Sequence, residues 1–270
     1  MAPSRRIRPL HREDARLDKP ARAYRFVVLA LAGTLTIGTY FAYDSIGAMV
    51  TTLMAARGLG QDDIGLLYSV YSIAAIVAVV PGGLLIDRIG TRRASLLFST
   101  LVVAGAAIVA LAPGLGTLAV GRVAFGLGSE SLIVAQGAIL ARWFRGRELA
   151  LAFGVALAMS RLGTLFSFNT EALLAVRFGP AVALWIAAGL CLASLLANVA
   201  LNALDRHAER VPGLLEPPAA GRISLADVRR FGAPFWLVSL LCFTFYAAIF
   251  PFTALSTDFF AAKWGLPLSV

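Results

Sequence analysis

Long apolar runs recur along this chain, and they constrain its fold more than any other feature. The hydrocarbon core of a bilayer is about 30 Å thick, so a helix needs roughly 20 apolar residues to cross it. Seven such runs occur, punctuated by glycine and proline, at approximately 26–52, 63–86, 94–112, 116–140, 149–174, 180–204 and 233–260. Only 14% of the residues are charged, against about 25% in soluble domains. The sequence therefore predicts an all-α, multi-pass membrane protein.

The remaining composition excludes several classes of function. Cys191 and Cys242 lie in apolar runs and both histidines lie in polar segments, so these residues form neither a metal site nor a disulfide framework. No nucleophile and base are arranged as in an enzyme, so we expect no catalytic residue and no cofactor. The net charge of +9 comes from basic connections between spans, which leaves no basic face for nucleic acid. The expected partners are the lipid bilayer and a small-molecule substrate.

Basic residues lie in alternate connections, which predicts the orientation of the helices. Lysine and arginine accumulate in cytoplasmic loops. The net charge is +10 over one set of segments, which comprises the tail at 1–25, the connections after the second and fourth spans and the stretch 205–232. The net charge of the other connections, in which we place Glu171 and Arg177, is −1. We therefore expect a cytoplasmic amino terminus, with no cleavable signal peptide before the first span.

A change of composition at 205–232 separates six spans from the seventh. Prolines and charges concentrate there, which predicts a cytoplasmic linker between a six-helix transport domain at 26–204 and the start of a carboxy-terminal transport domain at 233–270. The seventh span repeats the first at an offset of 206 residues. Tyr40, Ala42, Thr51, Ala55, Ala56 and Arg57 correspond to Tyr246, Ala248, Thr257, Ala261, Ala262 and Lys263. Six spans followed by a copy of the first, in the same orientation, fit a parallel repeat.

The connection after the second span carries an acid, a glycine turn and a basic cluster. It reads Gly83-Leu84-Leu85-Ile86-Asp87-Arg88-Ile89-Gly90-Thr91-Arg92-Arg93 and resembles the G-x-x-x-D-R-x-G-R-R signature of the major facilitator superfamily, with Thr91 in place of the usual base. Such charges can pair in one state of a transporter and separate in another; the alternative is a plain positive-inside loop. The expected gating residues are Gly83, Asp87, Arg88, Gly90, Arg92, Arg93, Arg122 and Glu148.

Further motifs resemble one branch of this superfamily, which contains the lysosomal dipeptide uniporter called major facilitator superfamily domain-containing protein one. They are Tyr40-Phe41-Ala42-Tyr43-Asp44, Leu66-Leu67-Tyr68-x-x-Tyr71-Ser72, Gly121-Arg122 through Gly126-x-Gly128-Ser129-Glu130-Ser131 to Ala135-Gln136, and Ser160-Arg161-Leu162-Gly163 with Asn169. The resemblance implies a major facilitator fold, here six helices, a linker and a seventh helix, with dipeptide transport by alternating access. The branch's animal members also use an accessory subunit and a tail sorting signal. The tail here has no dileucine, so we expect a prokaryotic relative in the inner membrane, without need of that subunit.

Four charges fall within the predicted spans, where an ionisable residue costs roughly 2.5–3.5 kcal/mol and usually faces a cavity. Glu130 and Arg161 lie at similar depth, whereas Arg122 is about 12 Å along the helix axis from Glu130. Glu130 and Arg161 could therefore clamp the amine and the carboxylate of a zwitterion, a role that the resemblance also implies. The alternative is a structural salt bridge between two helices. Asp44 and Arg122 could pair as an external gate, or Arg122 could tune proton coupling.

Tyrosines at helical spacing complete the expected site. They share one face of the first span with an aspartate, which favours a cavity lining over plain packing, and the glycines at 126 and 128 are expected to leave room for a ligand. The expected substrate-binding residues are Glu130, Arg161, Tyr40, Tyr43, Asp44, Tyr68, Tyr71, Gln136 and Asn169. The predicted function is secondary transport of small zwitterionic solutes, with dipeptides the best candidate. The alternatives are a proton-coupled carrier of organic anions, sugars or drugs, and a non-transporting receptor or scaffold.

Overall fold

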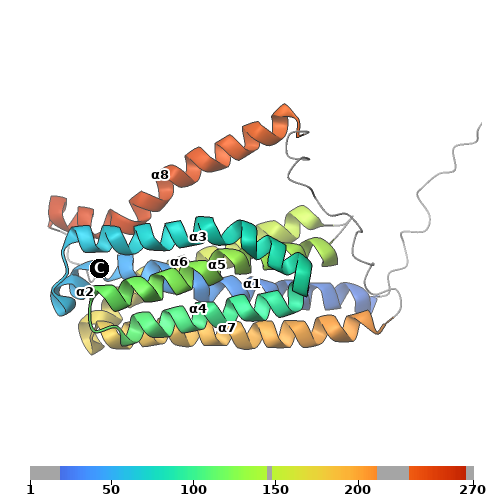
Figure 1. Cartoon of the computed structure of the whole chain (residues 1–270), viewed down its shortest axis with the longest axis horizontal. Helices are drawn as coiled ribbons and strands as arrows, with labels where there is room; N and C mark the ends of the chain where they lie inside the picture. The colour runs from blue at the N-terminus through green and yellow to red at the C-terminus, as the bar shows by residue number, and fades with distance from the viewer. Residues whose placement is uncertain (1–18, 145–147, 212–230, 266–270) are drawn as a thin grey trace, which may run out of the picture.

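Long helices run back and forth along one axis of the computed structural model (Figure 1). The structure describes residues 19–144, 148–211 and 231–265. The helices there are α1 (Lys19–Ala48), α2 (Val50–Arg57), α3 (Gln61–Ile89), α4 (Thr91–Leu111), α5 (Leu115–Trp143), α6 (Leu149–Phe178), α7 (Pro180–Glu209) and α8 (Ala233–Trp264). Over these described residues, seven helices are long and apolar enough to cross a membrane. The predicted all-α fold with seven spans is confirmed.

Glycine and proline set the ends of the helices, as the sequence predicts. Gly58, Gly90 and Gly179 have φ angles of 63°, 84° and 87°, a region that glycine enters without the steric cost of a Cβ atom. Gly90 donates its N–H to the Ile86 carbonyl at 2.9 Å, which ends α3, and α4 begins at the next residue. Pro180 occupies the first turn of α7, where its missing N–H is not needed.

The first predicted span is interrupted near its end. Met49 separates α1 from the short helix α2 and has φ −123° and ψ 27°, outside the helical region. The side chain of Met49 is buried, as is that of Leu53 one turn later. Residues 26–52, predicted as one run, therefore belong to two helices that meet inside the bundle.

The helices form a bundle of six spans, from which the seventh stands apart. α1 packs mainly on α6 and α7, and α5 packs on α3 and α4, while α8 has far fewer neighbours and contacts mainly α1 and α2. Figure 1 shows α8 diverging from the bundle toward its own amino-terminal end. We call the end that holds the start of α1 and the end of α7 the amino-terminal end of the bundle, and the end that holds α2 the opposite end.

Glycines on α5 allow neighbouring helices to approach closely. A Cβ atom built on Gly126 would lie 2.7 Å from the Tyr71 carbonyl oxygen of α3, and one built on Gly128 would lie 2.7 Å from the Phe98 carbonyl oxygen of α4. The space beside these glycines is therefore filled by backbone. The expectation that they leave room for a ligand is wrong, because small residues in membrane helices serve close packing equally well.

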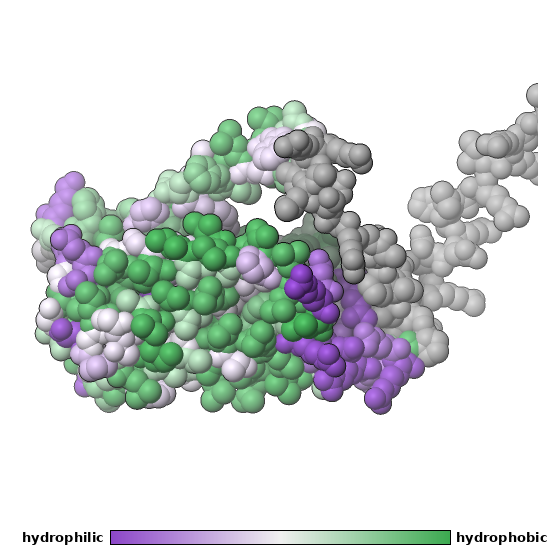
Figure 2. Space-filling view, viewed as in Figure 1, coloured by the Kyte–Doolittle hydropathy of each residue, from purple (hydrophilic) through white to green (hydrophobic). Residues whose placement is uncertain are grey.

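The surface carries a broad apolar band between two polar ends. Figure 2 shows hydrophobic residues over the middle of the bundle and hydrophilic residues gathered at both ends. Large apolar side chains such as those of Ile76, Val77 and Leu196 are more than 60% exposed. This pattern is the one that lipid tails and headgroups impose on a membrane protein.

The boundary after the sixth span differs from the predicted one. α7 continues to Glu209, so residues 205–209, expected in the linker, are helical, and Asp205 is only 6% exposed. Residues 212–230 of the linker, residues 1–18 of the tail, and Arg145 and Arg147 lie outside the described part of the chain.

Candidate functional site

A cavity of about 230 Å³ lies between α1, α3, α5 and α8. Its lining combines aromatic, hydroxyl and acidic side chains. These are Thr39, Tyr40, Tyr43, Tyr71, Ser72, Ala75, Ile76, Glu130, Ile133 and Phe250. This volume is well above the roughly 10–15 Å³ that one water needs, so the cavity has room for a small solute. Four of the predicted binding residues meet there: Tyr40, Tyr43, Tyr71 and Glu130.

Glu130 of α5 is the acidic group of the cavity. The Tyr71 hydroxyl on α3 donates to Glu130 Oε1 at 3.0 Å and lies 2.9 Å from Ser129 Oγ. Within the described part of the chain, no basic group lies within 4.0 Å of the carboxylate. A carboxylate can accept about four hydrogen bonds. Glu130 is therefore fixed in position by one neighbour and keeps free acceptor capacity toward the cavity.

Arg161 of α6 lies against aromatic rings instead of against an acid. Its Cζ is 5.1 Å from the Tyr40 ring centroid and 5.8 Å from those of Tyr246 and Phe250. Such contacts stabilise a guanidinium by about 0.5–2 kcal/mol, and they leave the N–H donors at the edge of the guanidinium available for hydrogen bonds. Tyr40 and Tyr246 are the pair related by the 206-residue repeat, so the first span and its copy hold this arginine between them.

Tyr40 links the two charges. It lines the cavity with Glu130, and its ring centroid lies 5.1 Å from the Arg161 Cζ. The structural salt bridge considered from the sequence is not formed in this structure, since no ion pair joins Glu130 to Arg161 among the described residues. An acid and an arginine thus share one aromatic neighbour while each keeps hydrogen-bonding capacity.

Arg122 of α5 is enclosed by rings and does not pair with Asp44 in the described structure. Its side chain is almost fully buried, and its Cζ lies 4.8–5.9 Å from the ring centroids of Tyr43, Tyr68, Tyr71 and Phe125. Its Nη1 donates to the Tyr43 carbonyl oxygen at 3.3 Å, whereas Nε and Nη2 have no hydrogen-bond partner. The expected Asp44–Arg122 gate is therefore not an ion pair here.

The other predicted binding residues lie outside the cavity lining. Gln136 is buried between α5 and α1, where its Nε2 donates to the Ala32 carbonyl oxygen at 2.6 Å. Asn169 is exposed and donates to the Leu165 carbonyl oxygen of its own helix. Tyr68 packs edge-on against Tyr43 with ring centroids 5.6 Å apart, behind the lining. Asp44 is buried on α1 and is not part of the lining either.

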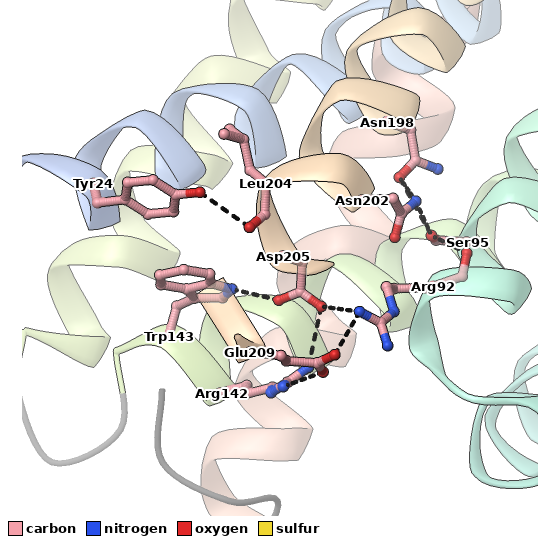
Figure 3. A network of polar contacts seen from close by, with 10 residues as sticks. All are labelled: Tyr24, Arg92, Ser95, Arg142, Trp143, Asn198, Asn202, Leu204, Asp205 and Glu209. Atoms are coloured by element: carbon pink, nitrogen blue, oxygen red, sulfur yellow. Dashed lines mark hydrogen bonds and ion pairs between the residues drawn. The ribbon is translucent and has the colours of Figure 1, made fainter. Parts of the chain in front are cut away.

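A charge network ties three helices together at the amino-terminal end (Figure 3). Arg92 at the start of α4 and Arg142 at the end of α5 both reach the acids of α7. Arg142 pairs with Asp205 at 3.1 Å and with Glu209 at 2.6 Å, and Arg92 pairs with Glu209 at 2.7 Å. The Trp143 indole N–H also donates to Asp205, at 3.0 Å. These acids were assigned to the linker by sequence, although their spacing of four residues places them on one face of a helix.

The rest of the predicted gating motif is exposed. Asp87, Arg88 and Arg93 lie on the surface beside Gly90, and none of them forms an ion pair within the described ranges. Gly83 is half-buried on α3, and Glu148 directly precedes α6 with φ 53°. Of the predicted basic cluster, the structure thus places Arg92 in the network with α7 and leaves the acid of the motif unpaired.

A buried polar ladder continues from this network into the bundle. Asn198 and Asn202 of α7 lie one turn apart, and the Asn202 Nδ2 donates to Asn198 Oδ1 at 3.0 Å. Across the interface, Asn198 donates to Ser99 Oγ at 2.7 Å and accepts from Ser95 Oγ at 3.3 Å. Hydrogen-bonded polar groups of this kind hold membrane helices in register. The polar residues between α4 and α7 therefore have a structural role.

Comparison with known proteins places these features in a family context. The sequence model of the Major Facilitator Superfamily matches residues 32–268. The "Lysosomal dipeptide transporter MFSD1" of Homo sapiens is 36% identical over 264 residues, covering 92% of this chain and 57% of its own length. The protein of the same name in Danio rerio is 35% identical, covering 98% of this chain and 59% of its own. The chain thus spans somewhat more than half the length of the curated relatives it matches.

A solved structure shares the fold. A bacterial homolog to the human lysosomal transporter Spinster, in an inward-facing and occupied conformation, superposes with a TM-score of 0.63 at 18% identity. The match covers 93% of this chain and 57% of that chain. At this identity the likeness concerns the arrangement of the helices alone.

Proposed function

The chain belongs to the Major Facilitator Superfamily, and from that premise we propose that it carries the amine- and carboxylate-binding groups of a dipeptide transporter that works by alternating access. The observation behind this proposal is the pair of charges around Tyr40. Glu130 and Arg161 are each held by aromatic side chains, and neither is ion-paired among the described residues. Both residues are half-buried within membrane spans, where charges without partners are costly, so this pair calls for a ligand that carries both complementary charges.

A small peptide with free ends has the required chemistry. Its ammonium group can donate to the Glu130 carboxylate, and its carboxylate can accept two parallel N–H bonds from Arg161. The aromatic lining by Tyr40, Tyr43 and Phe250 gives the apolar contact that most small-molecule sites provide. The relatives named dipeptide transporters support dipeptides over other zwitterions.

The carboxylate-binding arginine is placed where the two repeats meet. Tyr246 and Phe250 of α8 lie over Arg161, and Phe250 also lines the cavity. Movement of α8 relative to α1 would therefore change both the exposure of Arg161 and the shape of the cavity. This is the coupling that alternating access between two repeats requires.

The two sets of motif charges are proposed to have different tasks. Arg92 and Arg142 hold α4, α5 and α7 together, so that the bundle moves as one body. Asp87 and Arg93 are exposed and free of ion pairs within the described ranges, which makes them available for contacts that form and break during gating. From the basic connections we place the amino-terminal end of the bundle on the cytoplasmic side of the membrane.

Uptake by the full-length protein in liposomes tests this function. We expect accumulation of radiolabelled alanylalanine, and much weaker accumulation of free alanine, which cannot span the two charged groups in the same way. The Asp62→Asn variant, changed at an exposed acid at the opposite end, serves as the control and should match the wild type. Equal uptake of alanine and alanylalanine would exclude a site selective for dipeptides. Uptake of neither, together with uptake of an organic anion or a sugar that requires a pH gradient, would favour the proton-coupled carrier.

A further inference from the structure

A second buried acid lies at the contact between α1 and α6, away from the cavity. Glu171 and Ser45 are fully buried, and Ser45 Oγ contacts Glu171 Oε1 at 3.2 Å. The second carboxyl oxygen, Glu171 Oε2, has no hydrogen-bond partner, and neither has Oγ of the fully buried Ser167, one turn earlier on α6. The sequence placed Glu171 in a solvent-exposed connection, which the structure corrects, because α6 continues for seven residues beyond it to Phe178.

The surroundings supply no counter-charge for this carboxyl. Away from the amino-terminal end of the bundle, the charged groups of the elements packed on α6 are Asp44 on α1, Arg57 on α2, and Arg122 and Glu130 on α5, and α6 itself carries Arg161 and Arg177. Other charged residues of these elements, such as Arg25, Arg142 and Asp205, lie at the amino-terminal end. None of the arginines lies within 4.0 Å of Glu171 in the described structure. The first three turns of α7, which also contacts α6, contain no ionisable residue. Arg57 donates to the Ala112 carbonyl oxygen and is thereby occupied elsewhere.

An ionised carboxylate is therefore unfavourable in this packing. Moving an unpaired charge out of water costs several kcal/mol even after relaxation, and a buried acid avoids that cost by taking up a proton. Protonation also turns one carboxyl oxygen into an O–H donor. A proton on Oε2 would make this unpartnered oxygen a donor, which an ionised carboxylate lacks.

We propose that Glu171, with Ser45, forms a proton-binding site that is separate from the cavity and is occupied when α1 packs on α6 as in this structure. The proton comes from bulk water as the carboxylate becomes the acid, so no other reactant is required. Neither residue lines the cavity. Within the described ranges no group of three metal-ligating side chains is present, which favours a proton over a metal cation.

The location links this site to the contact with the seventh helix. Ser45 lies near the end of α1 at Ala48, two residues before Gly47. A Cβ atom built on Gly47 would lie 3.1 Å from the Ala254 carbonyl oxygen of α8, so the segment that contacts Glu171 also contains a contact with α8. Loss of the proton would charge the carboxyl at the α1–α6 contact, and the packing of α1 on α6 would then weaken as pH rises.

Thermal melting of the full-length protein in lipid nanodiscs, between pH 5 and 9, tests this site. Glu171→Gln is uncharged at every pH and keeps the shape of the protonated acid. We expect the stability of the wild type relative to Glu171→Gln to fall as pH rises, by up to tenfold in the folded-to-unfolded ratio per pH unit, because the folded state then holds a proton that the unfolded state has released. Asp62→Asn, at an exposed acid, should follow the wild-type profile.

Two further measurements keep the outcome decisive. Ser45→Ala retains the carboxyl and should retain the pH dependence, and an infrared band of a protonated carboxyl, present in the wild type and absent in Glu171→Gln, should report the proton directly. Parallel pH profiles for the wild type and Glu171→Gln would overturn the proposal. Stabilisation by Na⁺ at constant pH, lost in Glu171→Gln, would overturn it in favour of a metal cation.

Discussion

Four charged side chains at the amino-terminal end of the bundle, Arg92, Arg142, Asp205 and Glu209, are paired with one another, whereas the arginines and Glu130 within the spans contact rings and hydroxyl groups. Arg142 pairs with two acids of α7 at 3.1 and 2.6 Å. Arg122 and Arg161 lie on aromatic rings, and Glu130 accepts from a tyrosine. The first arrangement satisfies charges within the protein. The second holds charges in place without neutralising them, which suits groups that meet a ligand.

The contrast separates residues whose loss should affect folding from residues whose loss should affect binding. Removing one member of a paired set leaves its partner unsatisfied, and such losses are the most destabilising. Removing a charge that has no partner takes away its burial cost as well as its contacts. Substitutions of the paired residues should therefore lower the melting temperature. Substitutions of the unpaired charges should change the melting temperature less and should lower the ligand affinity.

Asp205→Ala should have the largest effect on stability. It removes the acceptor of Trp143 and one acceptor of Arg142, both of which would stay buried or partly buried. We expect a loss of about 3 kcal/mol in the free energy of unfolding, measured by denaturation of the full-length protein in detergent. Asp62→Ala, at an exposed acid, should cost less than about 0.5 kcal/mol. Equal losses in the two variants would mean that the network does not hold α7.

Gln136→Ala should lower stability by a smaller amount, about 1–2 kcal/mol, because it removes hydrogen bonds from the buried amide to Ala32 and Thr36 of α1. The ratio of affinities for free and amino-acetylated dipeptides should not change, since Gln136 does not line the cavity. A changed ratio with unchanged stability would place Gln136 in the binding site, as the sequence predicts.

Arg122→Met should leave stability within about 1 kcal/mol of the wild type. Methionine keeps much of the apolar length and removes a buried guanidinium that lacks partners at Nε and Nη2, which offsets the lost ring contacts. Arg142→Met serves as the comparison and should be clearly destabilising because it removes the guanidinium that pairs with both Asp205 and Glu209. If Arg122→Met were the more destabilising of the two, the distinction between paired and unpaired charges would fail.

Asp87→Asn should have the smallest effect, below about 0.5 kcal/mol, because this acid is exposed and has no ion pair within the described ranges. Its proposed role is in gating, so the uptake rate should fall while the melting temperature stays constant. A fall in melting temperature would indicate a structural partner for Asp87 instead.

The helices could be predicted from the sequence because their signals are local. A run of about 20 apolar residues and a glycine at a turn act within a few residues, and Gly90 and Gly179 end helices as expected. The aromatic and acidic residues of the cavity, such as Tyr40 and Glu130, were also found, because their types and spacing indicate a lined face. These local signals do not indicate which helix will pack beside a given residue.

The missed features all depend on that neighbour. Glu171 was counted with a loop because it lies near the end of an apolar run, yet burial against α1 decides its environment. Asp205 was assigned to a linker for the same reason, although Arg142 and Trp143 keep it inside the bundle. The room expected beside Gly126 is taken by backbone of α3. Packing partners of this kind cannot be read from one segment alone.

Dipeptide binding to the full-length protein, compared between Glu130→Gln and Arg161→Lys, tests the proposed clamp most directly. Glu130→Gln should weaken binding of free-amine dipeptides at least about tenfold, the worth of one charged hydrogen bond, while amino-acetylated dipeptides lose less. Arg161→Lys keeps the charge but loses the planar fork, so dipeptides with a free carboxylate should lose more than dipeptide amides. Equal losses for all ligands in both variants, together with recovered stability in a double variant that removes both charges, would show that the two residues hold helices together and do not bind peptides.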